Sequence, residues 1–485
     1  MGEPRLRATS GRLPHVTPSL GLAPSPTSAP VPRGTSVILD EQVQLLERAY
    51  AAGGSPWRLV KLTSEGRDLL EAWRRGGEVG PGQERFARTL INQGLVHPRY
   101  APHPDLTDVD VVVPVLDDTA GLVRLLNSLK GLPVTVVDDG SRNATSVADV
   151  CTHFGARLVR LDVNHGPAGA RNAGLAATTR RFVCFIDSDV QMDNAINVLA
   201  SLRGVCEDPL VGAVAPRVRG ARGHGLRAHF EHSSGALDLG ALRGLAVPGG
   251  HVPYVPSACL MVRRDAMGDG FDETLRCGED VDLVWRLSDA GWLVRYEPAI
   301  EVAHPARSNW LKWLRQRVSY GESAGALATR HGARLAPLRT DRTTAAAWIL
   351  TWLGQPALAA RLLAGAQKRI AAQLPEADQP GLLATRLVMR GPLRAGGYLA
   401  RAVVRTYGAA LLVMALHPKL RKRALTLYAL GTAWRWRGVR PSPGDVVLGA
   451  ADALAYGAGV VKGAVRNRTW APLRPVITGA PKRND

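Results

Sequence analysis

Residues 182–189 read FVCFIDSD, five apolar residues followed by two carboxylates with a serine between them. A short apolar run of this kind predicts a strand that is buried on both faces of a sheet. Two similar segments come earlier, DVVVPV at 110–115 and VTVVDDGS at 134–141. Helical spacing of apolar residues follows residue 118, and another helix is expected at 168–177. Alternating strands and helices predict an α/β fold with a mostly parallel sheet and crossover helices.

Polar residues follow each of these predicted strands directly. Parallel sheets bind ligands beyond the carboxyl ends of their strands, so these residues are expected to share one edge. Asp187 and Asp189 would project from one tight turn, where a divalent cation uses carboxylates together with phosphate oxygens. Mg²⁺ or Mn²⁺ in that position would act as a Lewis acid on a leaving diphosphate. The plain alternative is an acidic turn or helix cap.

Two further segments offer contacts to a nucleotide. The Asp139 carboxylate can accept the imide N–H of a uracil, whereas Asp138 is expected to cap a turn. Residues 164–172, NHGPAGARN, join a loop to a helix. The N–H groups at the start of that helix, together with Arg171, predict an anion or ribose site.

The last candidates lie far along the chain. Glu279 and Asp280 open a predicted helix, where the helix dipole favours acidic residues for structural reasons alone. The functional alternative is a general base that takes a proton from an acceptor hydroxyl. His304 follows a predicted strand and is either structural or a third metal ligand.

In this order, the motifs resemble those of the family-2 glycosyltransferases with the GT-A fold. The resemblance covers roughly residues 110–332 and implies an inverting enzyme that uses a nucleotide sugar and forms no covalent sugar intermediate. The motifs that carry it are Pro114-Val115, DDGS at 138, ARNAG at 170, DSD at 187, GFDE at 270 and ED at 279.

The same resemblance implies a role for each motif residue. Asp280 would be the catalytic base, with Glu279 as the second candidate. Asp187, Asp189 and His304 would bind the metal. The donor nucleotide would be bound by Pro114, Val115, Asp117, Asp139, Asn164, Gly166, Arg171, Asp187 and Ser188.

Two departures from the family pattern matter. Processive members carry a QxxRW motif, but the chain has Gln316-Arg317-Val318-Ser319-Tyr320 without the tryptophan. This absence argues against long-chain synthesis. The usual aromatic-Asn-Glu after the first strand is Leu116-Asp117-Asp118, so this corner of the base pocket is expected to differ.

A narrower resemblance comes from residues 53–59, GGSPWRL, and from the Ala/Leu/Arg-rich C-terminal region. With these features the chain is similar to the mycofactocin-system glycosyltransferases. That similarity implies β-1,4-linked glucose added from UDP-glucose to pre-mycofactocin, a redox cofactor derived from a peptide.

Composition divides the chain into four expected parts. Residues 1–35 are rich in Pro, Ser, Thr and Arg and lack the apolar stretch of a secretion signal, so a disordered tail is expected. Residues 36–104 predict a small winged-helix-like domain with a first helix near Leu45. This domain would bind a peptide or partner, or only cover the catalytic domain at 105–335. A helical region is expected at 336–485.

The net charge of +19 points to an anionic partner. The basic residues gather in the C-terminal third and are not interleaved with aromatics, which favours an anionic membrane surface over nucleic acid as the partner. Residues 343–360 are uncharged but interrupted, so helices lying on the cytoplasmic leaflet are expected, or a packed helical domain. Five scattered cysteines without a CxxC pair fit a reducing cytoplasm.

Three alternatives remain open. One is a glycosyltransferase that acts on a lipid or polysaccharide of the cell envelope. The second is a nucleotidyltransferase, which shares the α/β layout but leaves Glu279-Asp280 unexplained. The third is a non-catalytic peptide-binding module built on residues 36–104.

Overall fold

The computed structural model describes residues 29–478 except 48, 308 and 375–376. Most of the predicted tail at 1–35 therefore lies outside the described residues. Contacts divide the chain into two compact units, Met1–Ala306 and Arg307–Asp485, and each is described by itself below.

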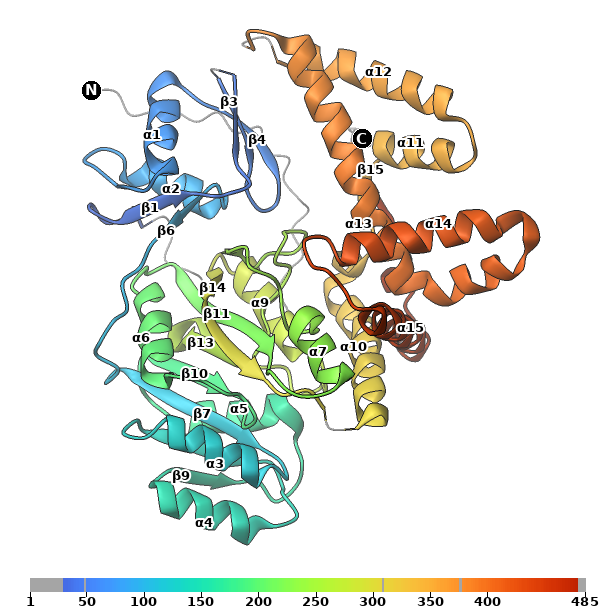
Figure 1. Ribbon diagram of the computed structural model, residues 1–485. Coiled ribbons are helices and arrows are strands. Elements are labelled where there is room, and N and C mark those ends of the chain that lie inside the picture. The colour runs from blue at the N-terminus through green and yellow to red at the C-terminus, as the bar shows by residue number, and fades with distance from the viewer. Residues whose placement is uncertain (1–28, 48, 308, 375–376, 479–485) are drawn as a thin grey trace. The chain divides into compact units, whose positions relative to one another are not determined.

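An eight-stranded sheet forms the centre of the first unit, in the order β12-β14-β11-β13-β10-β7-β8-β9 (Figure 1). The three strands expected from the sequence are β7 (Val109–Val115), β8 (Val134–Asp138) and β10 (Phe182–Ile186), and β9 (Arg157–Arg160) lies beside β8. Neighbours among these four pair in parallel, so their carboxyl ends share one edge as predicted.

The other half of the sheet brings a distant segment to the same edge. β13 (Cys259–Arg263) runs antiparallel to β10 and to β11 (Val211–Gly220). β14 (Leu293–His304) pairs in parallel with β11, so β14 has the direction of β10 and ends at the same edge. The short β12 (Gly244–Leu245) closes the sheet.

Helices cover both faces of this sheet. One buried cluster joins Val111 and Cys184 to apolar residues of α3 (Thr119–Ser128), α4 (Ala144–Phe154) and α6 (Ala195–Val205). The Asp118 carboxylate caps α3 by accepting the N–H of Gly121 at 3.0 Å.

The opposite face of the sheet carries α5 (Gly166–Ala176). A Cβ at Gly174 would lie 2.2 Å from Cγ1 of Val112, so only glycine lets α5 approach β7 this closely. This face also carries α9 (Glu279–Asp289), which packs on β14. The first unit further contains α7 (Leu226–Ser234) and α8 (Arg264–Met267).

The N-terminal part contains two helices and two small three-stranded sheets. The predicted helix near Leu45 is wrong, because the chain there forms a β-hairpin. Glu47, with φ of 47°, interrupts the run of apolar residues that suggested a helix. The Thr63 hydroxyl caps the next helix by accepting the N–H of Gly66 at 3.1 Å. The elements are β1 (Ser36–Leu39), β2 (Gln44–Leu46), β3 (Tyr50–Gly53), β4 (Arg58–Lys61), α1 (Ser64–Arg74), β5 (Gly77–Glu78), α2 (Glu84–Asn92) and β6 (Val96–Pro98).

A buried ion pair ties this N-terminal part to the central sheet. Arg88 of α2 donates two hydrogen bonds to the Asp208 carboxylate, at 2.8 and 3.0 Å, and both side chains are 5% exposed. The Tyr100 hydroxyl donates to the same carboxylate at 3.1 Å. Residues 36–104 are therefore joined to the part with the central sheet by a desolvated, hydrogen-bonded contact.

We expect Arg88→Ala to lower the free energy of unfolding by about 3 kcal/mol, because a buried carboxylate then loses its cation. Urea unfolding followed by circular dichroism measures this change. The matched control is Arg85→Ala, which removes an exposed arginine from the same helix. Equal stability of the two variants would contradict the structural role assigned to the buried pair.

The second unit is helical. α10 (Trp310–His331) packs closely on α15 (Pro443–Arg466). A Cβ at Gly321 would lie only 2.0 Å from the carbonyl oxygen of Tyr456, so the close approach of the two helices requires glycine at this position. The uncharged segment 343–360 is divided between two helices, α11 and α12. The remaining elements are η1 (Gly332–Leu335), β15 (Arg339–Asp341), α11 (Arg342–Trp352), α12 (Pro356–Ala372), α13 (Pro380–Leu416), α14 (Pro418–Arg435), η2 (Ala471–Leu473) and β16 (Val476–Thr478).

Two helices of this unit, α13 and α15, are long and apolar enough to cross a membrane, judged by length and composition alone. Of their most apolar windows, 28% and 44% respectively are buried within the protein. Buried core helices of soluble proteins have the same composition. This feature is therefore weak evidence for membrane association.

Candidate active site

The turn after β10 carries the first two candidate ligands. The carbonyl of Asp187 accepts the N–H of Val190 at 3.0 Å, and the N–H of Asp187 donates to Ala258 at 2.9 Å. Gln191 forms an isolated antiparallel bridge with Ala303. The end of β14 is thereby fixed against the turn, which brings His304 to residues more than a hundred positions earlier.

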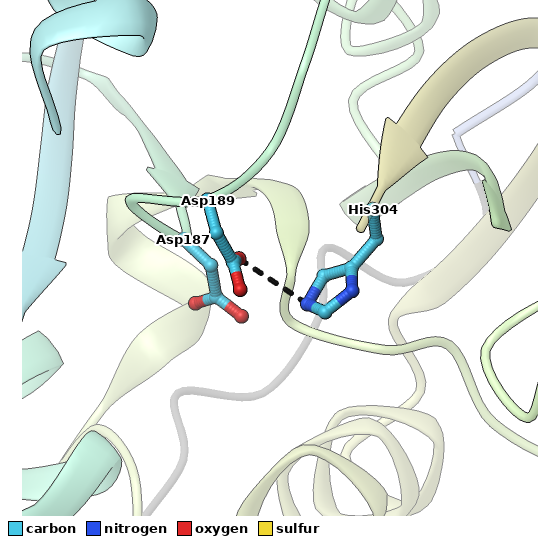
Figure 2. A group of neighbouring side chains, drawn as sticks. All are labelled: Asp187, Asp189 and His304. Atoms are coloured by element: carbon cyan, nitrogen blue, oxygen red, sulfur yellow. Dashed lines mark ion pairs between the residues drawn. The ribbon is translucent and has the colours of Figure 1, made fainter. Parts of the chain in front are cut away.

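Asp187, Asp189 and His304 form one cluster, in which a ligand atom of each lies within 4.8 Å of the others (Figure 2). His304 Nε2 lies 3.2 Å from Asp189 Oδ1, and Nδ1 lies 3.0 Å from the carbonyl oxygen of Pro305. If Nδ1 donates to that carbonyl, the Nε2 lone pair faces the carboxylate. Two acceptors facing each other need a proton or a cation between them.

The donor atoms of this cluster fit a divalent cation. Carboxylate oxygens suit Mg²⁺ and Mn²⁺, and an imidazole favours the transition metal of the two. The Asp189 and His304 side chains are 17% and 12% exposed, and that of Asp187 is 30% exposed. This partial exposure leaves room for ligands that a substrate would bring.

Arg171 connects this cluster to the predicted base. Its guanidinium donates to Asp187 at 2.7 Å and to Glu279 at 2.8 Å, and the side chain is 4% exposed. Burial by itself would lower the pKa of Arg171, but Asp187 and Glu279 outweigh burial and raise it. The guanidinium therefore stays charged and holds two segments that are distant in sequence.

The two base candidates differ in their surroundings. Glu279 is buried and paired with Arg171, so its charge is already compensated. Asp280 is partly buried and accepts the N–H of Val281 at 2.8 Å. Burial, and then the neighbouring Glu279 carboxylate, raise the pKa of Asp280 to about 7. A carboxyl group with this pKa is suited to proton transfer near neutral pH.

The two acids after β8 have separate tasks. Asp138 is fully buried, accepts the N–H of Ser141 at 2.9 Å and pairs with Arg160, so it holds the turn after β8, but α4 is capped by Asn143 and not by Asp138. Asp139 accepts the N–H groups of His165 and Gly166, at 2.7 and 2.9 Å. The Asp139 carboxylate thus holds the loop that starts α5, and its contact with a donor base stays a prediction.

The other predicted nucleotide contacts surround the same edge. Asp117, with φ of 54°, accepts the N–H of Arg142 at 2.8 Å. The Ser188 hydroxyl donates to Asp118 at 3.2 Å, which joins the turns after β7 and β10. Pro114 is partly buried in β7. Val115 is only 2% exposed, so its side chain belongs to the core.

Sequence reasoning did not identify Arg276 as a residue of this edge. Arg276 donates to Asn164 Oδ1 at 2.8 Å, and a Cβ at Gly166 would lie 2.7 Å from its guanidinium. The Asn172 amide likewise donates to the Phe271 carbonyl at 2.8 Å and so binds the ARNAG segment to the GFDE segment. The sequence carries no spacing signal for such long-range contacts.

Comparison with known proteins agrees with this geometry. Residues 110–271 match the family Glycosyl transferase family 2. The pre-mycofactocin glycosyltransferase of Mycobacterium tuberculosis is 39% identical over 472 residues, which are 93% of this chain and 99% of the relative. The N-acetylglucosaminyl-diphospho-decaprenol L-rhamnosyltransferase of M. tuberculosis is 29% identical over 41% of this chain and 76% of its own length.

Among solved structures, the mannosyltransferase PcManGT from Pyrobaculum calidifontis, in complex with GDP-Man and Mn²⁺, is similar to the chain. Its sequence is 17% identical, the match covers 75% of this chain and 89% of the mannosyltransferase, and the TM-score is 0.42.

The sheet has the α/β topology that was predicted, and the relative of 39% identity together with the family match confirms the predicted GT-A fold class and hexosyltransferase activity. Within that class, the chain belongs to the family of the pre-mycofactocin glycosyltransferases, a branch of the family-2 enzymes.

Proposed function

We propose that the chain transfers glucose from UDP-glucose to pre-mycofactocin, with inversion at the anomeric carbon and with a divalent metal ion. The observation that carries this proposal is the Arg171 bridge, which joins the acidic turn at Asp187 to the Glu279-Asp280 pair. The acidic turn proposed to bind the donor therefore lies next to the acidic pair proposed to take the proton from the acceptor. The relative from M. tuberculosis supports the acceptor, because its name specifies pre-mycofactocin and nearly its whole length is matched.

Asp187, Asp189 and His304 are the residues that would hold Mg²⁺ or Mn²⁺. Such an ion supplies Lewis-acid stabilisation of the negative charge that develops on a leaving diphosphate. The same edge offers the N–H groups at the start of α5 and the carboxylate of Asp139 to the nucleotide. These contacts would fix the donor with its anomeric carbon toward Asp280.

Asp280 is proposed to accept the proton of the acceptor hydroxyl as the hydroxyl oxygen attacks the anomeric carbon. The new C–O bond forms on the face opposite the diphosphate, whose C–O bond breaks in the same step. The electron pair leaves with the nucleoside diphosphate, and the proton remains on Asp280. One displacement inverts the anomeric centre, so an α-linked donor gives a β-glucoside.

A direct test is to supply the purified chain with UDP-glucose, GDP-mannose and UDP-N-acetylglucosamine in turn, with and without pre-mycofactocin. We expect UDP release and a hexosylated, water-soluble product only with UDP-glucose and the acceptor. A sugar-labelled product that partitions into organic solvent would instead favour the lipid alternative. Release of pyrophosphate would favour a nucleotidyltransferase.

The elevated pKa of Asp280 predicts the pH dependence of transfer. A protonated carboxyl cannot accept the hydroxyl proton, so kcat/KM should fall as the pH drops through the raised pKa of Asp280 and should be level above about pH 7. Initial rates from about pH 5.5 to pH 9 measure the profile. A profile that is flat across this range would contradict the assignment of Asp280 as the base.

We further propose that the enzyme works in the cytoplasm at the inner face of the cell membrane. Exposed apolar side chains on α13, such as Val413 and Leu416, and basic residues on α14 support this placement. Sedimentation with anionic vesicles, compared with neutral ones, tests it.

A further inference from the structure

The loop that leads into α5 is held from two sides. On one side the Asp139 carboxylate accepts the N–H groups of His165 and Gly166, at 2.7 and 2.9 Å. On the other side Arg276 donates from Nη1 to Asn164 Oδ1 at 2.8 Å and from Nη2 to the Asn164 carbonyl at 3.3 Å. Arg276 lies between the GFDE and ED segments, so this contact joins the loop to the segment that carries the acidic pair.

Gly166 lets the arginine lie against the backbone of this loop. A Cβ at this position would lie 2.7 Å from Nη1 of Arg276 and 3.1 Å from its Cδ, so a side chain here would displace the arginine. Gly166 also has φ of 84°, a conformation that favours glycine. The contact between the guanidinium and the loop therefore depends on the residue types at both ends.

Hydrogen bonds, more than packing, order this loop. Asn164 and His165 are exposed, and so is Arg276. Among the described residues, Arg276 forms hydrogen bonds only with Asn164. Fixing a flexible loop when a ligand binds has an entropic cost, and a loop that is already fixed avoids this cost. The guanidinium is therefore placed to prepare the loop for a ligand.

Two other contacts hold the same segments together independently of Arg276. The Asn172 amide donates to the Phe271 carbonyl at 2.8 Å, and its Oδ1 accepts the N–H of Phe271 at 2.9 Å. Arg171, the residue before it, pairs with Glu279 at 2.8 Å. Replacement of Arg276 would therefore release the loop while α5 stays joined to the start of α9.

We propose that Arg276 is a positioning residue for the donor nucleotide. It acts through Asn164, by holding the loop before α5 in the shape that receives a nucleoside diphosphate. This inference rests on the proposed function, in which the loop binds the donor. It further assigns to Arg276 an effect on donor affinity and not on the proton transfer at Asp280.

The first test measures nucleotide binding without turnover. UDP is titrated by calorimetry into the purified full-length chain in the presence of Mn²⁺ and without acceptor. We expect Arg276→Gln to weaken UDP binding about tenfold, because the loop must then be ordered on binding. Asn164→Ala should cause a similar loss, and the double variant no further loss, since both changes remove the same contact. The matched control is Arg124→Gln, which removes an exposed arginine from α3.

The second test separates positioning from a general structural role. In steady-state transfer, Arg276→Gln should raise KM for the donor about tenfold, while kcat and KM for the acceptor stay within about twofold. Arg276→Lys keeps the charge but not the two-pronged contact, so it should recover part of the affinity. Thermal unfolding temperatures should not change, because the side chain is exposed.

The outcomes distinguish this proposal from the proposed function. Unchanged UDP affinity in Arg276→Gln, or additive losses in the double variant, would overturn the role of Arg276 even if the wild type transfers glucose. A fall in kcat and in unfolding temperature would show a structural role and overturn it as well. If the wild type binds GDP and not UDP, the proposed donor is wrong, and the same variants are then compared with GDP. Failure of the wild type to bind either nucleotide would overturn both proposals.

Discussion

Asp280→Asn is expected to lower kcat roughly 10³-fold and to leave KM for both substrates nearly unchanged. The amide keeps the size of the carboxyl group but cannot accept the hydroxyl proton. Steady-state rates of UDP release with saturating acceptor measure the effect. Because Asp280 is only partly buried, we expect thermal unfolding of the variant to match that of the wild type.

Two companion variants sharpen this experiment. Asp289→Asn, at the exposed end of α9, makes the same chemical change outside the site and should be silent. Glu279→Gln removes the partner of Arg171 and also a negative charge that raises the pKa of Asp280, so it should impair positioning and move the inflection of the pH profile to a lower pH. Near-wild-type turnover in Asp280→Asn, with loss of turnover in Glu279→Gln, would reverse the two assignments.

Asp189→Ala is expected to reduce transfer by about 10³-fold, because a metal ligand contributes several kcal/mol of charge stabilisation. The same substitution should weaken binding of Mn²⁺ to the protein without substrates, which calorimetry measures independently of turnover. The control is Asp193→Ala, an exposed acid four residues further along the chain. Unchanged Mn²⁺ affinity in Asp189→Ala would remove Asp189 from the metal site.

The sequence was enough to predict that the acidic residues after the strands lie at one edge of the sheet, because this placement follows from the topology of a parallel sheet. Strands β7, β8 and β10 are recognisable from short apolar runs, and parallel pairing places the residues that follow them at one edge. The position of His304 could be inferred only through family resemblance. In the structure, the pairing of β14 with β11 accounts for it.

The contacts that organise the site could not be predicted. The bridge from Arg171 to Asp187 and Glu279 spans up to 108 residues, and nothing in its sequence spacing distinguishes it from a surface arginine. The hairpin near Leu45 was missed for a local reason, because one residue with positive φ at Glu47 overrides apolar spacing. The spacing of apolar residues predicts helices and strands well, but turns and long-range ion pairs depend on the three-dimensional fold.

The Arg171 bridge has a thermodynamic consequence for the order of events. A single unit of positive charge is divided between the donor-side and acceptor-side acids. A divalent ion that neutralises Asp187 would add positive potential near Asp280 and make that carboxyl a stronger acid. Linkage then requires ionisation of Asp280 to tighten ion binding by the same factor. Binding of the divalent ion and ionisation of the Asp280 carboxyl would therefore be thermodynamically coupled, so that each favours the other.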